Sequence, residues 1–414
     1  MKKIVQAWTG ISLVQRIVAG LVIGALLGMF VPSEGGIAIL GDVFVGALKA
    51  IAPLLVFFLV ISSLCYAGKS HGGVIRTVII MYMFSTFLAA IVAVTASSAF
   101  PVTLTLVDAA TDMAAPQGVA EVLRTLLMNV VTNPVQSLVS ANYIGILVWA
   151  VLIGIALRKA SDTTKQSLND ISAALSKTVT WIIQCAPFGI MGLVYNTVSV
   201  NGLSTFTEYG KLLAVLLGSM LFIYFVTNPI LVFWCIRKNP YPLIFKCLKK
   251  SAITAFFTRS SAANIPINME ACAEMGLDKD TYSVTIPLGA TINMDGAAIT
   301  ITIMTLAAAN TLGIQVSLPA AILLSVMSAL GACGASGVAG GSLLLIPMAC
   351  SLFGISNDVA MQMVGVGFII GVVQDSVETA LNSAGDVEFA ATAEYHQWRK
   401  QGKPLPEFLS GKKN

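Results

Sequence analysis

The chain has 414 residues, of which 56% are hydrophobic and only 11% are charged, whereas soluble domains carry about 25% charged residues. This composition excludes an ordinary soluble domain, and the mean hydropathy of +0.85 predicts a multi-pass membrane protein. The net charge of +4 says nothing about nucleic acid, and no nucleic-acid partner is expected; Lys and Arg gather in short segments between apolar runs, as membrane topology requires. The seven cysteines contain no C-x-x-C pair, so neither a disulfide framework nor a zinc site is expected.

Eight apolar segments are long enough to cross a bilayer, which requires about 20 residues per helix. They are residues 13–32, 40–66, 75–101, 119–157 (interrupted), 168–198, 211–236, 283–312 and 358–390. Two further stretches differ from plain spans, because residues 242–272 carry several basic residues and residues 315–354 are interrupted by glycines. Residues 101–141 contain three prolines and are expected to form interrupted helical pieces on the outer side.

Basic residues alternate between the connecting segments. They precede the first span, follow the second, fourth and sixth, and close the chain, whereas the other connections hold mostly acids. Because Lys and Arg mark the cytoplasmic side, we expect both termini in the cytoplasm. The stretch 242–272 would then enter the membrane from the cytoplasm and 315–354 from outside, each shielded by protein. Residues 397–414 are expected to form a short, mobile cytoplasmic tail.

Polar residues form a stripe in the last span. Asp375, Thr379, Asn382 and Asp386 are spaced 4, 3 and 4 residues apart, which places them on one face of a helix with Glu378 at its edge. Acids on one face of a spanning helix are expected to point into the protein, toward cations or hydrogen-bond donors. The alternative is a set of structural hydrogen bonds between helices.

A second polar stretch interrupts the seventh span. Gly289, Asn293 and Gly296 weaken the helix there, since glycine lacks a side chain and asparagine competes for backbone groups. We expect an unwound segment whose freed carbonyls, together with Asp295, form an oxygen cage for a hard cation. A kink satisfied by neighbouring groups is the alternative.

Residues 242–272 and 315–354 both contain residues that are typical of turns and helix caps. Ser260 and Ser261 are suited to cap a helix whose free N–H groups would hold a carboxylate, although a plain cytoplasmic turn would also explain them. In the second stretch, glycine recurs every third residue from Gly331 to Gly340, which indicates either close helix packing or a flexible re-entrant tip. Two broken segments in one half of a chain are typical of transporter binding sites.

Four motifs together resemble one family. TRSS at 258–261, NMDG at 293–296, GASGVAGG at 334–341 and N-x-x-x-D at 382–386 are similar to those of the dicarboxylate/amino acid:cation symporters, which have the sodium-coupled glutamate transporter fold. The resemblance covers nearly the whole chain. In its length and in its departures from the family pattern, the chain is most similar to the bacterial serine/threonine:sodium members.

The resemblance implies an all-α fold of about eight transmembrane helices plus two opposed re-entrant hairpins, at about 242–272 and 315–350. It also implies a homotrimer surrounded by lipid in the bacterial inner membrane. Residues 1–240 would mainly form the trimerisation scaffold, with the third span, 75–101, shared with the transport unit. Residues 241–396 would form the transport core, followed by the tail 397–414.

The resemblance further implies three sodium sites and no other cofactor. The first would use Gly289, Asn293, Asn382 and Asp386. The second would use Thr291, Met294, Ala332, Cys333 and Ala335. The third would use Asp295, Tyr82, Ser85 and Thr86.

The implied substrate site lies beside these ions. The substrate carboxylate would meet Ser260, Ser261, Gly337 and Val338, and the substrate amino group would meet Asp375. Thr379 and Asn382 would complete the pocket, with Ala297 and Glu378 at its edge.

Two departures from the family pattern predict the substrate. Glu378 stands where acidic-substrate members carry arginine, and Ala297 where they carry threonine. An acid at that place would repel a second substrate carboxylate. We therefore expect a sodium-coupled importer of small neutral amino acids, L-serine and L-threonine, that works by elevator-type alternating access. The sequence leaves open whether Glu378 is ionised or hydrogen-bonds the substrate hydroxyl.

Two alternatives remain. A transporter of the same fold could couple amino acid or dicarboxylate transport to protons through its buried carboxyl groups. Residues 334–337 also match the GxSG pattern of intramembrane serine proteases, with Ser336 as nucleophile. That nucleophile needs a base within hydrogen-bond reach, and the only later histidine, His396, is expected at the opposite side of the membrane. An enzyme is therefore the remote alternative, and no catalytic residues are expected.

Overall fold

The computed structural model describes residues 11–31, 36–66, 73–106, 128, 131–335 and 340–409, and every regular element among them is helical. The first half contains α2 (Leu13–Phe30), α3 (Ala38–Tyr66), α4 (Gly73–Ala99), α6 (Pro134–Val139), α7 (Tyr143–Ala156), η1 (Leu157–Lys159), α8 (Asp162–Gln184), α9 (Ala186–Asn201), α10 (Thr205–Phe222), η2 (Ile223–Thr227) and α11 (Asn228–Ile236). The second half contains α12 (Tyr241–Cys247), η3 (Leu248–Ala252), α13 (Ile253–Thr258), α14 (Ser261–Glu274), α15 (Lys279–Ile292), α16 (Asp295–Thr311), α17 (Leu318–Ala332), η4 (Ser342–Leu345), α18 (Ile346–Ser351), α19 (Asn357–Lys400) and η5 (Glu407–Leu409).

Several of these helices are long and apolar enough to cross a membrane. The described residues contain 6 such helical segments, or up to 7 if α8 and α9, which are bent by 56°, form one broken span. Residues 119–127 and 129–130 of the expected fourth crossing lie outside the described residues. The multi-pass, all-α class is therefore confirmed, while the total of eight crossings stays a prediction.

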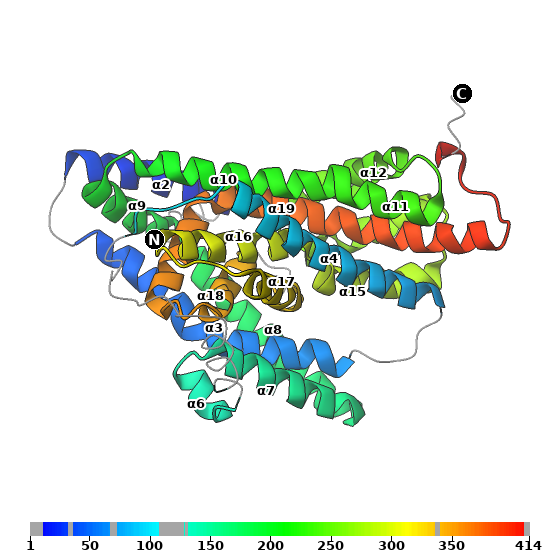
Figure 1. Cartoon of the computed structure of the whole chain (residues 1–414), viewed down its shortest axis with the longest axis horizontal. Helices are drawn as coiled ribbons and strands as arrows, with labels where there is room; N and C mark the ends of the chain where they lie inside the picture. Colours follow the sequence, from blue (N-terminus) through cyan, green and yellow to red (C-terminus); the bar gives the residue numbers. More distant parts are fainter. Residues whose placement is uncertain are drawn as a thin grey trace.

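The helices pack as two regions. One, which we call the glycine-packed region, contains α2, α3, α7, α8 and α9, which contact one another. The other, the α19 region, contains α4 and all elements from α10 to α19, most of which contact α19. Figure 1 shows α19 running lengthwise through the molecule, with α10 and α11 along one side and α4 and α15 along the other. By packing, then, α10 and α11 group with the later helices, although they lie within residues 1–240.

The two stretches that differ from plain spans, residues 242–272 and 315–354, fold as helical hairpins. In hairpin 1 the elements α12, η3 and α13 run to Arg259, which has a left-handed backbone (φ 52°), and α14 returns. In hairpin 2, α17 is followed by η4 and α18, and the tip residues 336–339 lie outside the described residues. The elements α12 and α18 lie toward opposite ends of the molecule in Figure 1, in agreement with hairpins that enter from opposite sides.

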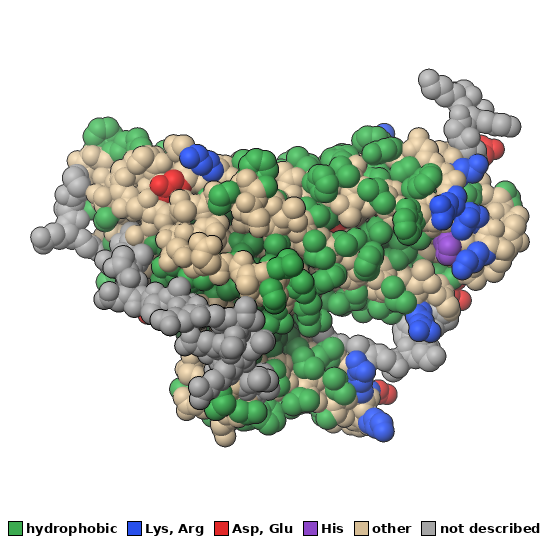
Figure 2. All heavy atoms as spheres, in the orientation of Figure 1, with side chains coloured by type: hydrophobic (Ala, Val, Ile, Leu, Met, Phe, Trp, Pro, Cys, Tyr) green, Lys and Arg blue, Asp and Glu red, His purple; other side chains and the backbone are tan. Residues whose placement is uncertain are grey.

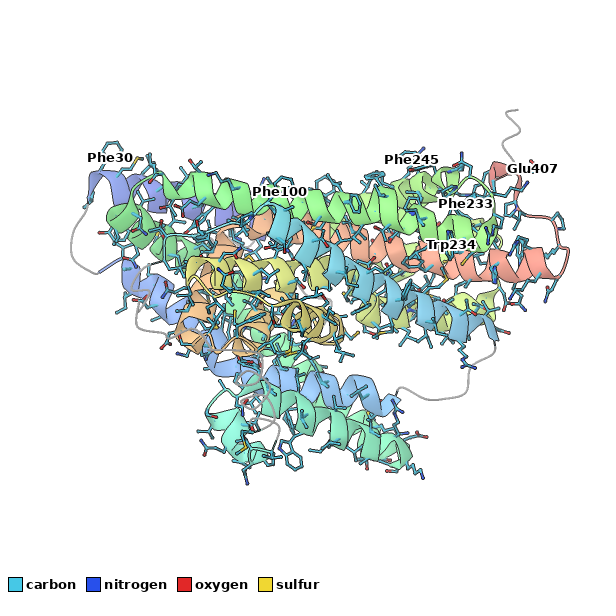
Figure 3. The ribbon with its side chains drawn as sticks, viewed as in Figure 1. Phe30, Phe100, Phe233, Trp234, Phe245 and Glu407 are labelled. Carbon is cyan, nitrogen blue, oxygen red and sulfur yellow. The ribbon has the colours of Figure 1, made fainter. Side chains whose placement is uncertain are left out.

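The surface is that of a membrane protein. Hydrophobic side chains cover the middle of the molecule in Figure 2, and Lys and Arg gather at the end where α11, α12 and the last turns of α19 lie. Phe233, Trp234 and Phe245 project at the surface near this end (Figure 3), and Trp234 is 68% exposed. Aromatic side chains near a basic end are typical of the membrane–water interface.

The tail packs against the rest of the protein as far as Leu409, which differs from the mobile end that the sequence led us to expect. Lys246 lies over the ring of Phe408, with its Nζ 4.3 Å from the ring centroid, and Leu409 is buried. These apolar side chains give the tail a surface to pack with, which the expectation from its polar composition overlooked. Residues 410–414 lie outside the described residues.

Candidate functional site

The seventh span is broken where the sequence predicts. The helix α15 ends at Ile292 and α16 begins at Asp295. Between them, Asn293 (φ −98°, ψ 83°) and Met294 (φ −127°, ψ 53°) leave the helical conformation. A break exposes the last carbonyls of one helix and the first N–H groups of the next. The unwound segment expected from the glycine and asparagine pattern is therefore confirmed.

The first expected sodium set comes together at this break. The side-chain amide of Asn293 donates to Asp386 Oδ1 at 3.0 Å and to the carbonyl of Asn382 at 3.2 Å. Asn293 Oδ1 and Asp386 Oδ2 are buried without a hydrogen-bond partner. A Cβ on Gly289 would lie 2.6 Å from Asp386 Oδ1, so glycine is needed for this close approach. Two orphaned oxygens in a tight, buried cradle fit a small cation.

The third expected set lies on the other side of the break. The carboxylate of Asp295 accepts hydrogen bonds from Ser85 at 2.6 Å and from Thr86 at 3.2 Å, both on α4. Tyr82, one turn earlier, donates its hydroxyl to the carbonyl of Asp386 at 2.9 Å. The helix α4 therefore connects the two sets, and all members of the third set are buried.

The second expected set is less assembled. Cys333 Sγ lies 3.7 Å from the carbonyl of Ile292, which brings the end of α17 to the break. However, Thr291 is exposed and its hydroxyl donates to Leu288 of its own helix at 2.7 Å. The carbonyl of Ala332 accepts the N–H of Ala335 at 2.9 Å. Among the described side chains of this set, none is a buried oxygen without a partner.

Asp375 contacts one described residue of each hairpin. Arg259, at the tip of hairpin 1, places its Nε 2.6 Å from Asp375 Oδ2. The N–H of Gly340, next to the tip of hairpin 2, donates to Asp375 Oδ1 at 3.0 Å. The side chains of the pair are 10% and 4% exposed, so this is a buried charge pair. The carboxylate expected to bind a substrate ammonium thus holds a cation of the chain itself.

Three of the remaining expected substrate residues lie at the start of α14 and on α19. Ser260 caps α14 by accepting the N–H of Ala263 at 3.2 Å, which confirms the expected N-cap, and Ser261 beside it is buried. Thr379 is one turn along α19 and donates to the carbonyl of Asp375 at 2.7 Å. Gly337 and Val338 lie outside the described residues.

Asn382 connects this part of the site to the helix break. Its Oδ1 accepts the N–H of Gly296 at 2.8 Å, and its amide lies 3.4 Å from Met294 Sδ. Ala297, the residue of α16 that follows Gly296, is fully buried. One residue of α19 therefore contacts both the break and the start of α16.

Glu378 is tied into the protein by three donors. Its Oε2 accepts from Thr300 on α16 at 2.7 Å, from Ser342 on η4 at 2.9 Å and from Gln374 on α19 at 2.6 Å. All four residues are buried. This carboxyl group therefore joins hairpin 2 to two helices of the α19 region, a role that the sequence did not reveal.

Sequence reasoning missed Arg259 as a site residue. A signal was present, because an arginine inside a membrane hairpin requires a buried acid, and Asp375 lies at the middle of the last span. Thr300 and Ser342 gave no such signal, since they are ordinary polar residues of apolar helices, whereas Gln374 lies four residues before Glu378 on the same helix.

Comparisons with known proteins identify one family. Residues 13–395 match the model of the sodium:dicarboxylate symporter family. The chain is 60% identical to a serine/threonine transporter SstT of Bifidobacterium adolescentis, over 100% of this chain and 96% of that protein. It is 56% identical to a protein of the same name from Streptococcus thermophilus, over 97% and 100% of the two chains. For the one from Streptococcus agalactiae the identity is 58%, over 95% and 98%.

Proposed function

Because the chain belongs to the sodium:dicarboxylate symporter family, we propose that it imports L-serine and L-threonine together with sodium. It is a multi-pass membrane protein and a transporter rather than an enzyme. The observation that carries the proposal is the buried pair between Arg259, at the tip of hairpin 1, and Asp375 on α19. The names of the relatives support the substrate.

The pair suits an amino acid zwitterion. The substrate ammonium takes the place of Arg259 at Asp375, and the released guanidinium turns to the substrate carboxylate. Each buried charge then keeps a partner, which matters because an uncompensated buried charge is strongly unfavourable. The capped N-terminus of α14, with Ser260 and Ser261, supplies further donors for the carboxylate. A simple carboxylate or a simple amine would leave one charge unmatched.

Glu378 and Ala297 favour a short, neutral side chain. A second substrate carboxylate beside Glu378 would meet a negative charge in a buried place. The small, buried Ala297 adds no donor there. The hydroxyl of serine or threonine can instead donate to an acid such as Glu378.

Sodium would bind at the helix break in α15–α16. The orphaned oxygens of Asn293 and Asp386, the carboxylate of Asp295 and the hydroxyls of Ser85 and Thr86 are the oxygen donors that a hard cation prefers. Because Asn382 joins this break to the substrate stripe, ion binding would order the pocket. The α19 region would move as the transport unit of a homotrimer in the bacterial inner membrane, with both termini cytoplasmic.

Uptake into vesicles tests the proposal. Reconstituted protein is given labelled L-serine with an inward sodium gradient at constant pH, and uptake above the sodium-free rate is expected. L-glutamate and succinate serve as negative controls for competition. Uptake driven only by a pH gradient would favour proton coupling, and efficient competition by succinate would favour dicarboxylate transport.

A further inference from the structure

Glu388 is a buried carboxyl group that none of the three sodium sets uses. It lies on α19, two residues after Asp386, and is fully buried. Among the described residues, neither of its oxygens has a hydrogen-bond partner of good geometry, and no ion pair involves it. A carboxylate in such a place is strongly unfavourable unless a cation or several donors accompany it.

The neighbours of Glu388 lead to the third sodium set. The amide of Asn228, on α11, interacts with the carboxyl groups of both Glu388 and Asp295. Asn228 Oδ1 also lies 3.3 Å from Ser85 Oγ, and that hydroxyl lies 2.6 Å from Asp295 Oδ2. Because a hydroxyl has one proton and the shorter contact takes it, Ser85 cannot also satisfy Asn228 Oδ1. Oxygen acceptors therefore outnumber donors across this cluster.

Two further groups lie within electrostatic range of Glu388, and neither is a strong donor. They are Tyr224 and Cys247. The hydroxyl of Tyr224 already donates to the carbonyl of Ile244 at 3.1 Å. A thiol is a weak donor. The charge on Glu388 is thus matched neither by a basic side chain nor by a set of hydrogen bonds within the described residues.

We propose that Glu388 holds a monovalent cation, sodium, beside Asp295, and that the side-chain amide of Asn228 turns its oxygen toward that ion. Carboxylate and amide oxygens are the ligands that a hard cation prefers. The oxygen donors around Asp295 then extend from α4 across to α11. One cation balances the carboxylate of Asp295, and the added cation balances the carboxylate of Glu388. This inference rests on the proposed sodium coupling, and it adds a bound ion to it.

The test uses the full-length protein with Glu388→Gln, which keeps the shape and removes the charge. The thermal midpoint is measured without serine as choline is replaced by sodium. An ion that binds the folded state raises this midpoint, and the slope of the midpoint against the logarithm of the sodium concentration rises with the number of bound ions. We expect this slope in the variant to correspond to one sodium ion fewer. The ratio of sodium to serine carried into vesicles should also fall by one.

Glu394→Gln is the matched control. Glu394 is also a buried acid of α19, but its two oxygens accept the N–H of Asp278 at 2.9 and 3.0 Å. This variant should keep the steepness and the flux ratio of the parent. If Glu388→Gln does not fold, Glu388→Asp is used instead. Its shorter side chain keeps the carboxylate but places it farther from the proposed ion, so this variant should need more sodium for the same stabilisation.

Equal steepness and flux ratio in Glu388→Gln and the parent would overturn the inference, as would an unchanged sodium requirement in Glu388→Asp. Neither result touches the proposed function. A parent protein whose midpoint and serine uptake ignore sodium would instead refute the proposed function itself.

Discussion

The helix pairs α2–α9 and α16–α19 both pack closely, but with different chemical groups. In α2–α9 the contact is glycine against backbone, because a Cβ on Gly20 would lie 2.1 Å from the carbonyl oxygen of Pro187. In α16–α19 glycine also allows the two helices to approach closely, and this approach permits a hydrogen bond between them. The N–H of Gly296 donates to Asn382 Oδ1 at 2.8 Å, and a Cβ on Gly296 would lie 2.9 Å from Glu378 Cα.

The difference teaches how one chain combines contacts that depend on shape alone with polar contacts that a ligand can replace. Glycine packing depends on van der Waals contact and offers nothing that a ligand can replace. Carboxylates and amides in the α19 region can exchange a partner in the protein for an ion or an amino acid. Substitutions in the first region should therefore change stability, and those in the second should change ligand binding.

The largest effect is expected from Asp375→Asn. Removing one partner of a buried charge pair costs about 2–5 kcal/mol, so serine affinity should fall by about 30-fold or more. Equilibrium binding of labelled serine at saturating sodium measures this. A normal size-exclusion profile controls for folding, and unchanged affinity would contradict the role of Asp375 at the substrate ammonium.

Gly289→Ala tests the ion side of the α19 region. The new Cβ would lie 2.6 Å from Asp386 Oδ1 and 2.9 Å from the hydroxyl of Tyr82, so the oxygens must shift. We expect the sodium concentration for half-maximal serine binding to rise by about 10-fold or more. Gly210→Ala on α10 meets no atom within 4 Å and should leave that concentration unchanged. Equal responses of the two variants would remove Gly289 from the ion site.

Gly20→Ala tests the glycine-packed region. Overpacking of this kind costs about 1–3 kcal/mol, because α2 must move away from α9. The thermal midpoint should fall while the sodium and serine affinities of the folded protein stay as they were. Gly46→Ala on α3 has open space around its Cβ and is the control. A changed serine affinity in Gly20→Ala would show that the two regions are not separable.

Glu378→Gln refines the contrast within the α19 region. The amide oxygen can still accept from Thr300 and Ser342, but these bonds lose the benefit of charge, and serine affinity should fall by about fivefold. The repulsion of acidic substrates disappears, so L-aspartate should begin to compete with serine. If competition by aspartate stays absent, the exclusion of acidic substrates has another cause.

The smallest effect is expected where the two regions touch through an ion pair. Lys49 on α3 pairs with Asp358 at the start of α19, and the two side chains are 41% and 80% exposed. Such pairs contribute about 0.2–1 kcal/mol. Lys49→Met and Asp358→Asn, alone and together, should change serine uptake rates by about fivefold at most. A larger, non-additive change would make the pair a controlling contact between the regions.

The sequence by itself determined the class of the protein, the positions of most helices, and the break at residues 293–294. These features follow from local rules, because apolar length sets a span and Gly, Asn and Asp weaken a helix where they stand. The polar stripe of α19 was equally readable, since helical spacing alone places Asp375, Thr379, Asn382 and Asp386 on one face.

Only the tertiary structure decided which group each of these residues meets. Asp375 pairs with Arg259, 116 positions away, and Glu378 accepts from Thr300 on α16 and Ser342 on η4. Such partners depend on how helices pack, and helical periodicity gives a face but not its neighbour. The same holds for Glu388, whose isolation becomes visible only when α11, η2 and α12 are placed around it.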